Sequence, residues 1–202
     1  NIDKKRLEQL GATNVEVIGN IKLAQLPKVK QILKKPEATL ITAASTHENE
    51  ELLILKSYKK THGKLVIVPR HPERFEKVHL LINEYIKNKD LTYHRYSQKD
   101  DFESDIILVD KMGILNDIYA ISDVVILGGA FEKIGGHNPV EPAFFKCKII
   151  SGKNIFNQKS LFDCIKNYYL IQNDELEEYL DNIKNLEIPV LTKAGSFEPI
   201  FN

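Results

Sequence analysis

Two glycine pairs lie close together in the stretch VVILGGAFEKIGGHNPVEP, residues 124–142. Its apolar start predicts a buried strand that ends at Gly128-Gly129, and Gly135-Gly136 follows after a short loop. Glycine accepts a positive φ and lets a ligand approach the backbone closely. The glycines could instead serve only tight turns. Two pairs interleaved with polar residues favour a ligand site.

The polar residues after the second glycine pair could bind a phosphate and a sugar. Asn138 is a good N-cap residue and Pro139 fits the first turn of a helix, so free N–H groups there could face an anion. Glu141, further along that helix, would offer two acceptor oxygens to sugar hydroxyls. His137 could donate a hydrogen bond. Because His137 has no second histidine at zinc-protease spacing, no metal site is expected.

Arg70 directly follows a predicted buried strand, in the run VPRHPERF. The planar guanidinium of arginine matches a phosphate or a carboxylate with two parallel hydrogen bonds. The alternative is a structural ion pair with Glu73 or Glu48. His71 could donate to the same phosphate. Arg74, one turn later, is expected to be a solvated helix residue rather than a second anion ligand.

Two further strand ends carry candidate residues. Met112-Gly113 combines an approachable backbone with a soft apolar side chain, which suits a flat base, or the glycine simply starts a helix. Ser45 and Thr46 would cap a helix, with Glu48 at capping-box spacing, so a ligand contact of Ser45 is secondary. Loops at the carboxyl ends of parallel strands share one edge of a sheet, which predicts that these loops form one site.

Strands and helices alternate along the chain, which predicts an α/β fold with one doubly wound (Rossmann-like) parallel sheet covered on both faces. The last stretch, residues 188–202, is expected to be a loop or a tail. The expected strands are residues 15–18, 39–44, 64–68, 91–96, 106–109, 124–127, 148–150 and 169–171. The expected helices are residues 3–10, 28–35, a segment from the Ser45-Thr46 cap to about 63, a segment after the VPRHPERF loop to about 86, and residues 114–121, 139–145, 158–167 and 174–185.

The composition excludes several classes of protein. The 28 basic and 28 acidic residues balance, so no nucleic-acid partner is expected. No apolar run approaches the roughly 20 residues that span a bilayer, which predicts a soluble chain. Cys147 and Cys164 lack a metal-binding spacing and are expected to be reduced core thiols. The chain starts without Met, which suggests a piece of a longer protein.

Several familiar signatures are absent, namely GxGxxG with a following acid, GxxxxGK[ST] and GxSxG. Dehydrogenases, kinases and serine hydrolases are therefore disfavoured. The remaining interpretation is a sheet edge that holds a phosphate, a base and a sugar, as a nucleotide-sugar donor site does. Two alternatives stay open: a UDP-sugar transferase or epimerase domain of the GT-B type, and a non-catalytic nucleotide-binding or scaffolding domain whose glycines are only turns.

Four motifs, ITAASTHENEE, VPRHPERF, DKMGILNDIYAISDVVILGG and IGGHNPVEPAFFKC, together resemble the C-terminal half of the Kdo transferases. These bacterial enzymes are similar in fold to GT-B glycosyltransferases and transfer 3-deoxy-D-manno-octulosonic acid (Kdo) from CMP-Kdo to lipid A precursors, in lipopolysaccharide core biosynthesis. The segment VIGNIKLA matches the entry into this half, and the resemblance covers about residues 7–178. It implies that residues 1–202 form a single CMP-Kdo-binding domain and that the N-terminal acceptor domain is absent.

The resemblance also implies donor contacts. The family usually reads DTMGEL where this chain reads DKMGIL, so Lys111 replaces a threonine and Ile114 replaces a glutamate. Lys111 could add a positive charge near the donor phosphate. The implied contacts are Pro69, Arg70, Met112, Gly113, Ile114, Asn138, Pro139, Val140 and Glu141. Further candidates are Ser45, His71, Lys111, Gly136 and His137.

The resemblance further implies an inverting transfer without a cofactor, on the cytoplasmic face of the bacterial inner membrane. No metal is expected, because the sequence offers no paired carboxylates at this edge and arginine plus backbone dipoles can replace one. The general base, the lipid A precursor site and the membrane association belong to the N-terminal half in this family. No catalytic residue is therefore expected in this chain, which should bind CMP-Kdo but not turn over alone.

Overall fold

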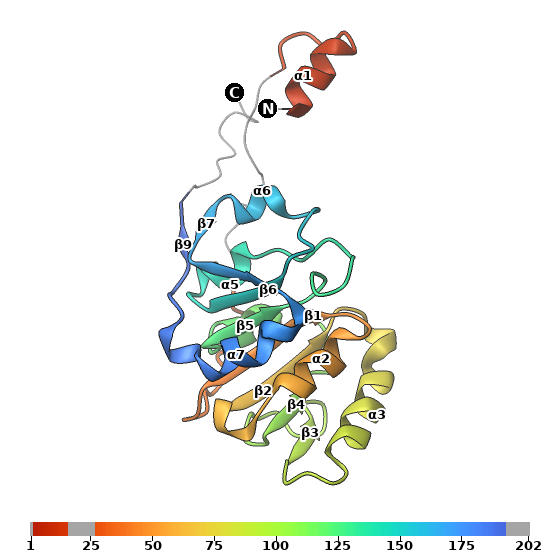
Figure 1. Cartoon of the computed structure of the whole chain (residues 1–202), viewed down its shortest axis with the longest axis vertical. Helices are drawn as coiled ribbons and strands as arrows, with labels where there is room; N and C mark the ends of the chain where they lie inside the picture. The colour runs from red at the N-terminus through yellow and green to blue at the C-terminus, as the bar shows by residue number, and fades with distance from the viewer. Residues whose placement is uncertain (1, 16–26, 193–202) are drawn as a thin grey trace. The chain divides into compact units, whose positions relative to one another are not determined.

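The computed structural model describes residues 2–15 and 27–192, and the contacts divide the chain into two units (Figure 1). In the first unit, α1 (Ile2–Gln9) confirms the helix expected at residues 3–10, and Gly11 follows it with φ 93°. The expected strand at 15–18 and the segment VIGNIKLA lie almost wholly outside the described residues, as does most of the expected tail. The second unit, Pro27–Thr192, carries every candidate site residue.

The second unit contains a seven-stranded sheet in the order β3-β4-β2-β1-β5-β6-β8, in which every neighbouring pair is parallel. Residues of β1 pair with both neighbours, as when Ala43 lies opposite Ile67 of β2 and Ile126 of β5. The predicted doubly wound parallel sheet is confirmed. The strands are β1 (Leu40–Thr46), β2 (Lys64–Pro69), β3 (Tyr93–Arg95), β4 (Ile106–Leu108), β5 (Val124–Leu127), β6 (Lys148–Gly152) and β8 (Tyr168–Ile171).

Helices cover both faces of this sheet because successive strand residues point to opposite sides. On one face Ile41 and Ala43 pack in a core with α2 (Glu50–Ser57), α3 (Phe75–Ile86) and α7 (Leu176–Asp181), which lie together in front of the sheet in Figure 1. On the other face Ala44 packs in a core with residues of α4 (Leu115–Tyr119) and α6 (Lys159–Phe162). The remaining α-helix of this unit, α5 (Val140–Phe144), contacts α4 and β6.

Three expected helices are wrong or too long. Residues 28–35 form no helix, because the Lys30 and Gln31 N–H groups donate to the Asp117 carboxylate at 2.6 and 3.4 Å. The helix expected at 158–167 stops at Phe162, and β7 (Ile165–Lys166) pairs antiparallel with β9 (Val190–Leu191). The segment 174–185 divides into α7 and two short 3-10 turns, η4 (Asn173–Glu175) and η5 (Ile183–Asn185).

The segment after β1 also differs from the prediction. Ser45 and Thr46 do not cap a helix, since β1 continues to Thr46 across a register shift and Ser45 has φ 55°. The following helix, α2, starts at Glu50 after Asn49, whose φ is 71° and whose side chain makes no capping bond. Ser45 therefore lies near the carboxyl end of β1 and not at the start of a helix.

The strand order reverses beside β1, which lies between β2 and β5. In open α/β sheets the crevice at the carboxyl ends of two such strands is where ligands bind. Two 3-10 turns, η2 (Lys60–His62) and η3 (Pro72–Arg74), precede β2 and α3. Cys147 and Cys164 are buried free thiols, as predicted. Within the described parts of the chain, the helices are too short or too polar to cross a membrane.

Candidate functional site

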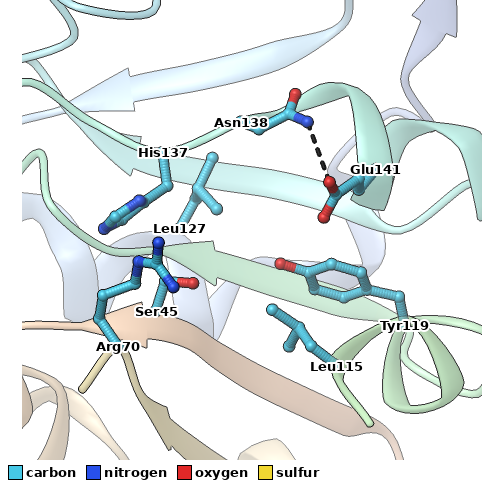
Figure 2. Close-up of a pocket in the computed structure, with 8 residues that line it drawn as sticks. All are labelled: Ser45, Arg70, Leu115, Tyr119, Leu127, His137, Asn138 and Glu141. Atoms are coloured by element: carbon cyan, nitrogen blue, oxygen red, sulfur yellow. Dashed lines mark hydrogen bonds between the residues drawn. The ribbon is translucent and has the colours of Figure 1, made fainter. Parts of the chain in front are cut away.

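A pocket of about 200 Å³ lies at the carboxyl ends of β1, β2 and β5 (Figure 2). It therefore sits where the strand order reverses, as the topology predicts. The side chains come from three strand ends, from α4 and from the loop that leads into α5. The residues that line it are Ser45, Arg70, Leu115, Tyr119, Leu127, His137, Asn138 and Glu141.

The loop after β5 needs glycine for steric reasons at two positions. A Cβ on Gly128 would lie 2.6 Å from the Ser45 carbonyl oxygen, so any side chain there would push β1 and β5 apart. Gly129 has φ 73°, and a Cβ on it would lie 2.8 Å from the His137 ring. Glycine at both positions lets the two strand ends and the histidine close around the pocket.

The buried carboxylate of Glu50 holds this loop in place. One oxygen accepts from the N–H groups of His47 (2.9 Å) and Gly129 (2.8 Å), and the other accepts from Ala130 and Phe131 (3.1 Å each). Burial raises the pKa of Glu50, and the backbone donors oppose that rise. Because all four partners donate, the geometry requires the ionised carboxylate. Glu50 therefore fixes the ends of β1 and β5 relative to each other.

Arg74 is not the solvated helix residue that its position predicts. Its Nη2 lies 2.9 and 2.8 Å from the two oxygens of the buried Glu51 carboxylate, and the Thr46 hydroxyl also donates to Glu51 at 2.8 Å. Glu51 therefore pairs with Arg74. Arg70 is exposed and lines the pocket, and within residues 2–15 and 27–192 it has neither of the ion pairs considered as alternatives, with Glu73 or Glu48.

His137 joins the pocket wall to the end of β1. Its Nε2 lies 2.8 Å from Nε2 of His47, and the His47 ring lies 5.5 Å from the His71 ring, centroid to centroid. Burial, together with the positive charges of nearby groups, lowers the pKa of His137 to about 4, and burial also lowers the pKa of His47. Both rings are neutral at pH 7, so the positive charge at this end of the pocket comes from Arg70.

The opposite end of the pocket is acidic. The Asn138 side chain accepts from the Val140 N–H at 3.0 Å and donates to a Glu141 carboxylate oxygen at 3.1 Å (Figure 2). The helix α5 starts at Val140 rather than Pro139 and has only five residues, so Asn138 orients Glu141 more than it caps a long helix. The second oxygen of Glu141 is available to a ligand hydroxyl.

The structure brings some of the predicted site residues together and leaves others aside. Five of them line the pocket: Ser45, Arg70, His137, Asn138 and Glu141. Four more lie beside the lining residues. Pro69 ends β2, Gly136 and Pro139 are buried in the loop before α5, and Val140 is the buried first residue of α5. The remaining five do not line it: exposed Lys111, Met112 and Gly113, buried Ile114, and exposed His71.

The turn that contains Met112 and Gly113 leads directly into α4, and α4 does supply two lining residues, Leu115 and Tyr119. Sequence reasoning missed these two, and it missed Glu50 and Glu51. The signal for the acids was their position just before the apolar run LLIL, which predicts burial, and buried acids require partners. Tyr119 gave no signal that separates it from a core aromatic.

The pocket can bind an anion beside an alcohol. Arg70 supplies a charged donor at one end, and Glu141 supplies an acceptor at the other. No cluster of three or more metal-ligating side chains occurs in the two described ranges. A nucleoside phosphate has the required combination of an anionic group and sugar hydroxyls.

Comparisons with known proteins agree with this geometry. No family model matches the chain. A bifunctional glycosyltransferase/methyltransferase of Fusobacterium nucleatum is 36% identical over 203 residues, which cover 92% of this chain and 31% of that protein. The 3-deoxy-D-manno-octulosonic acid transferases of Haemophilus influenzae and Aquifex aeolicus are 36% and 37% identical, cover 80% and 74% of this chain, and are each covered over 41% of their length.

A solved structure points to the same relationship. The C-terminal CMP-Kdo binding domain of WaaA from Acinetobacter baumannii superposes with a TM-score of 0.61 and 29% identity, over 73% of this chain and 79% of that one. The chain spans less than half the length of the curated relatives described above. It has the fold of a GT-B glycosyltransferase domain, as predicted. By sequence and by fold, the chain belongs to the 3-deoxy-D-manno-octulosonic acid transferase family and corresponds to its C-terminal domain.

Proposed function

We propose that this chain is the donor-binding domain of a glycosyltransferase that moves Kdo from CMP-Kdo to a lipid A precursor. The observation that carries the proposal is the pocket at the strand reversal. The Arg70 guanidinium, which has no ion pair with a described residue, lies at one end, and the oriented carboxylate of Glu141 lies at the other. The names of the relatives support the choice of donor. The whole chain, residues 1–202, is proposed to serve this one donor-binding role.

In this proposal Arg70 binds the phosphate of CMP and Glu141 accepts hydrogen bonds from the ribose. The pocket of about 200 Å³ is smaller than the roughly 300–1,000 Å³ of sites that enclose a drug-sized ligand, so it holds only part of the nucleotide. The base then lies toward the turn at Met112-Gly113, where the Met112 side chain is 55% exposed. Lys111, also exposed, adds a second positive charge at this edge.

The proposed transfer is inverting and independent of a metal. Arg70 stabilises the negative charge that develops on CMP as the sugar leaves. A base must remove the proton from the acceptor hydroxyl, and we assign that base to an N-terminal half of the parent enzyme, together with the acceptor site and the association with the cytoplasmic face of the inner membrane. The chain alone is then expected to bind the donor without turnover. Transfer by the full-length enzyme should survive EDTA, and loss of activity on chelation would contradict the metal-independent mechanism.

Calorimetric titration of the chain with CMP, UMP and UDP tests the choice of nucleotide. We expect saturable binding of CMP that exceeds binding of either uridine nucleotide. Tighter binding of UDP would favour a UDP-sugar transferase or epimerase domain. Absence of binding to all three would favour the scaffolding interpretation, and in that case the Arg70→Ala and Glu141→Ala variants would behave as the wild type does.

A further inference from the structure

Tyr119 is a buried tyrosine whose hydroxyl opens onto the pocket. The residue ends α4 and is 1% exposed, its ring lies 6.5 Å from the Phe145 ring, and its carbonyl accepts from the Cys147 thiol at 3.2 Å. Its burial and the neighbouring Phe145 ring hold the Tyr119 ring in place. Figure 2 shows the hydroxyl pointing into the pocket, on the same side as Glu141. Tyr119 therefore presents a single polar atom to a ligand from an otherwise apolar wall.

The hydroxyl lacks a partner among the pocket residues. Among the eight lining residues, the only hydrogen bond between side chains joins Asn138 to Glu141. The hydroxyl opens onto the pocket, so a ligand can reach it. Burial and the charge of Glu141 raise the pKa of Tyr119 well above its usual value, so the hydroxyl keeps its proton and can donate.

The two polar groups at this end of the pocket have different requirements. The Glu141 carboxylate only accepts hydrogen bonds, and one of its oxygens already accepts from Asn138. The Tyr119 hydroxyl needs an acceptor for its proton. A ligand hydroxyl meets both needs, because it can accept from Tyr119 and donate to Glu141 at the same time.

We infer that Tyr119 is a specificity-determining residue that recognises a ribose hydroxyl of the bound nucleotide together with Glu141. This inference rests on the proposed nucleotide site and deepens it. Removing the ribose hydroxyl would leave the Tyr119 proton unpaired in the pocket. The domain should therefore discriminate a ribonucleotide from its deoxy analogue, and the discrimination should depend on Tyr119.

The test compares CMP, 2′-deoxy-CMP and 3′-deoxy-CMP by calorimetry at constant salt, on the wild type and on Tyr119→Phe. We expect one deoxy analogue to bind the wild type about tenfold more weakly than CMP, which corresponds to about 1.4 kcal/mol. Tyr119→Phe should lose about tenfold in CMP affinity and bind that analogue as the wild type does. The identity of the affected analogue shows which hydroxyl Tyr119 contacts.

The matched control is Tyr58→Phe. Tyr58 is also buried, but its hydroxyl donates to the carbonyls of Gly63 and Asp105, away from the pocket. This variant should unfold at a lower temperature and keep the wild-type ratio of CMP to deoxy-CMP affinity. Tyr119→Phe must in turn keep a cooperative thermal transition.

Equal affinity of the wild type for all three nucleotides would overturn the inference, and this result requires no variant. Equal losses for all three in Tyr119→Phe would also overturn it, because they would indicate a structural role for the ring. In both cases CMP binding itself would leave the proposed function standing. Failure of the wild type to bind any cytidine nucleotide would overturn the proposed function and the inference together.

Discussion

His47 and His137 join the loops after β1 and β5 through their Nε2 atoms, which lie 2.8 Å apart. One ring must donate and the other must accept, so the bond requires at least one neutral ring. The permanent positive charges that act on the pair are those of Arg70 and Arg74. The Glu50 carboxylate accepts from the His47 backbone N–H. The environment therefore favours the neutral pair.

This pair predicts a loss of stability in mild acid. The pKa of His137 falls from 6.5 in the unfolded chain to about 4 in the folded one, so between these values the unfolded chain binds the extra proton. Stability is complete above pH 6.5 and falls as the pH drops toward 4. At pH 5 the loss would be about 2 kcal/mol for an enclosed ring, and solvent at the open edge of the pocket reduces it to about 1 kcal/mol.

Thermal unfolding of the wild type and of His137→Asn between pH 7.5 and 5 measures this effect. Asparagine cannot titrate in this range. The melting temperature of His137→Asn should therefore fall by about 2–4 °C less than that of the wild type between pH 7.5 and 5. His94→Asn is a suitable control. His94 lies on β3, a strand at the edge of the sheet, and contacts Ser104 and Asp101 rather than the pocket. Parallel pH profiles for the wild type and His137→Asn would contradict the assignment.

Glu50→Gln should destabilise the domain strongly. The Glu50 carboxylate accepts four backbone hydrogen bonds, and the NH₂ group of glutamine would face two of these donors. Two buried N–H groups would lose their acceptor, at about 1–3 kcal/mol each. The melting temperature should fall by roughly 5–15 °C.

Glu48→Gln is the matched control, because Glu48 is exposed and pairs with Lys77 at the surface. This variant should change the free energy of unfolding by less than about 0.5 kcal/mol. Equal shifts for both variants would contradict the role of Glu50.

The sheet and the strand ends could be predicted because their signals are local. Val, Ile and Leu runs that end in glycine or in Pro69-Arg70 define β2 and β5, and parallel topology then brings Arg70 and Glu141 to one pocket. The partners of Glu50 could not be predicted, because three of its four donors lie about 80 residues away. The helix expected at 28–35 failed for a similar reason, since Asp117, more than 80 residues away, accepts from backbone N–H groups of that segment.

Gly129→Ala should damage the pocket more than a comparable change at Gly113. Both glycines have a positive φ, 73° at Gly129 and 83° at Gly113, so alanine is strained by about 1–2 kcal/mol at either position. Only at Gly129 would the new Cβ also collide, 2.8 Å from His137, whereas at Gly113 the nearest atom is Lys30 Nζ at 3.5 Å. We expect the larger fall in melting temperature for Gly129→Ala. Equal falls for the two variants would mean that the contact with His137 relaxes freely.

Arg70→Ala should weaken the binding of CMP and leave the binding of cytidine unchanged. Arg70 lacks a carboxylate partner within the described ranges, so its charge is available to a phosphate, and a charge-assisted pair of about 2 kcal/mol corresponds to roughly 30-fold in affinity. Arg70→Lys should recover part of that loss, since an ammonium keeps the charge but cannot form two parallel bonds. Arg95→Ala removes the same charge from an arginine that is bonded to Asp110 and Glu76, outside the pocket, and should leave the CMP affinity unchanged. The measurement is calorimetry with CMP and with cytidine on the wild type and the three variants. It shows whether Arg70 contributes to the affinity for the phosphate-bearing ligand alone. An equal loss for cytidine and CMP in Arg70→Ala would show that Arg70 supports the pocket rather than the phosphate.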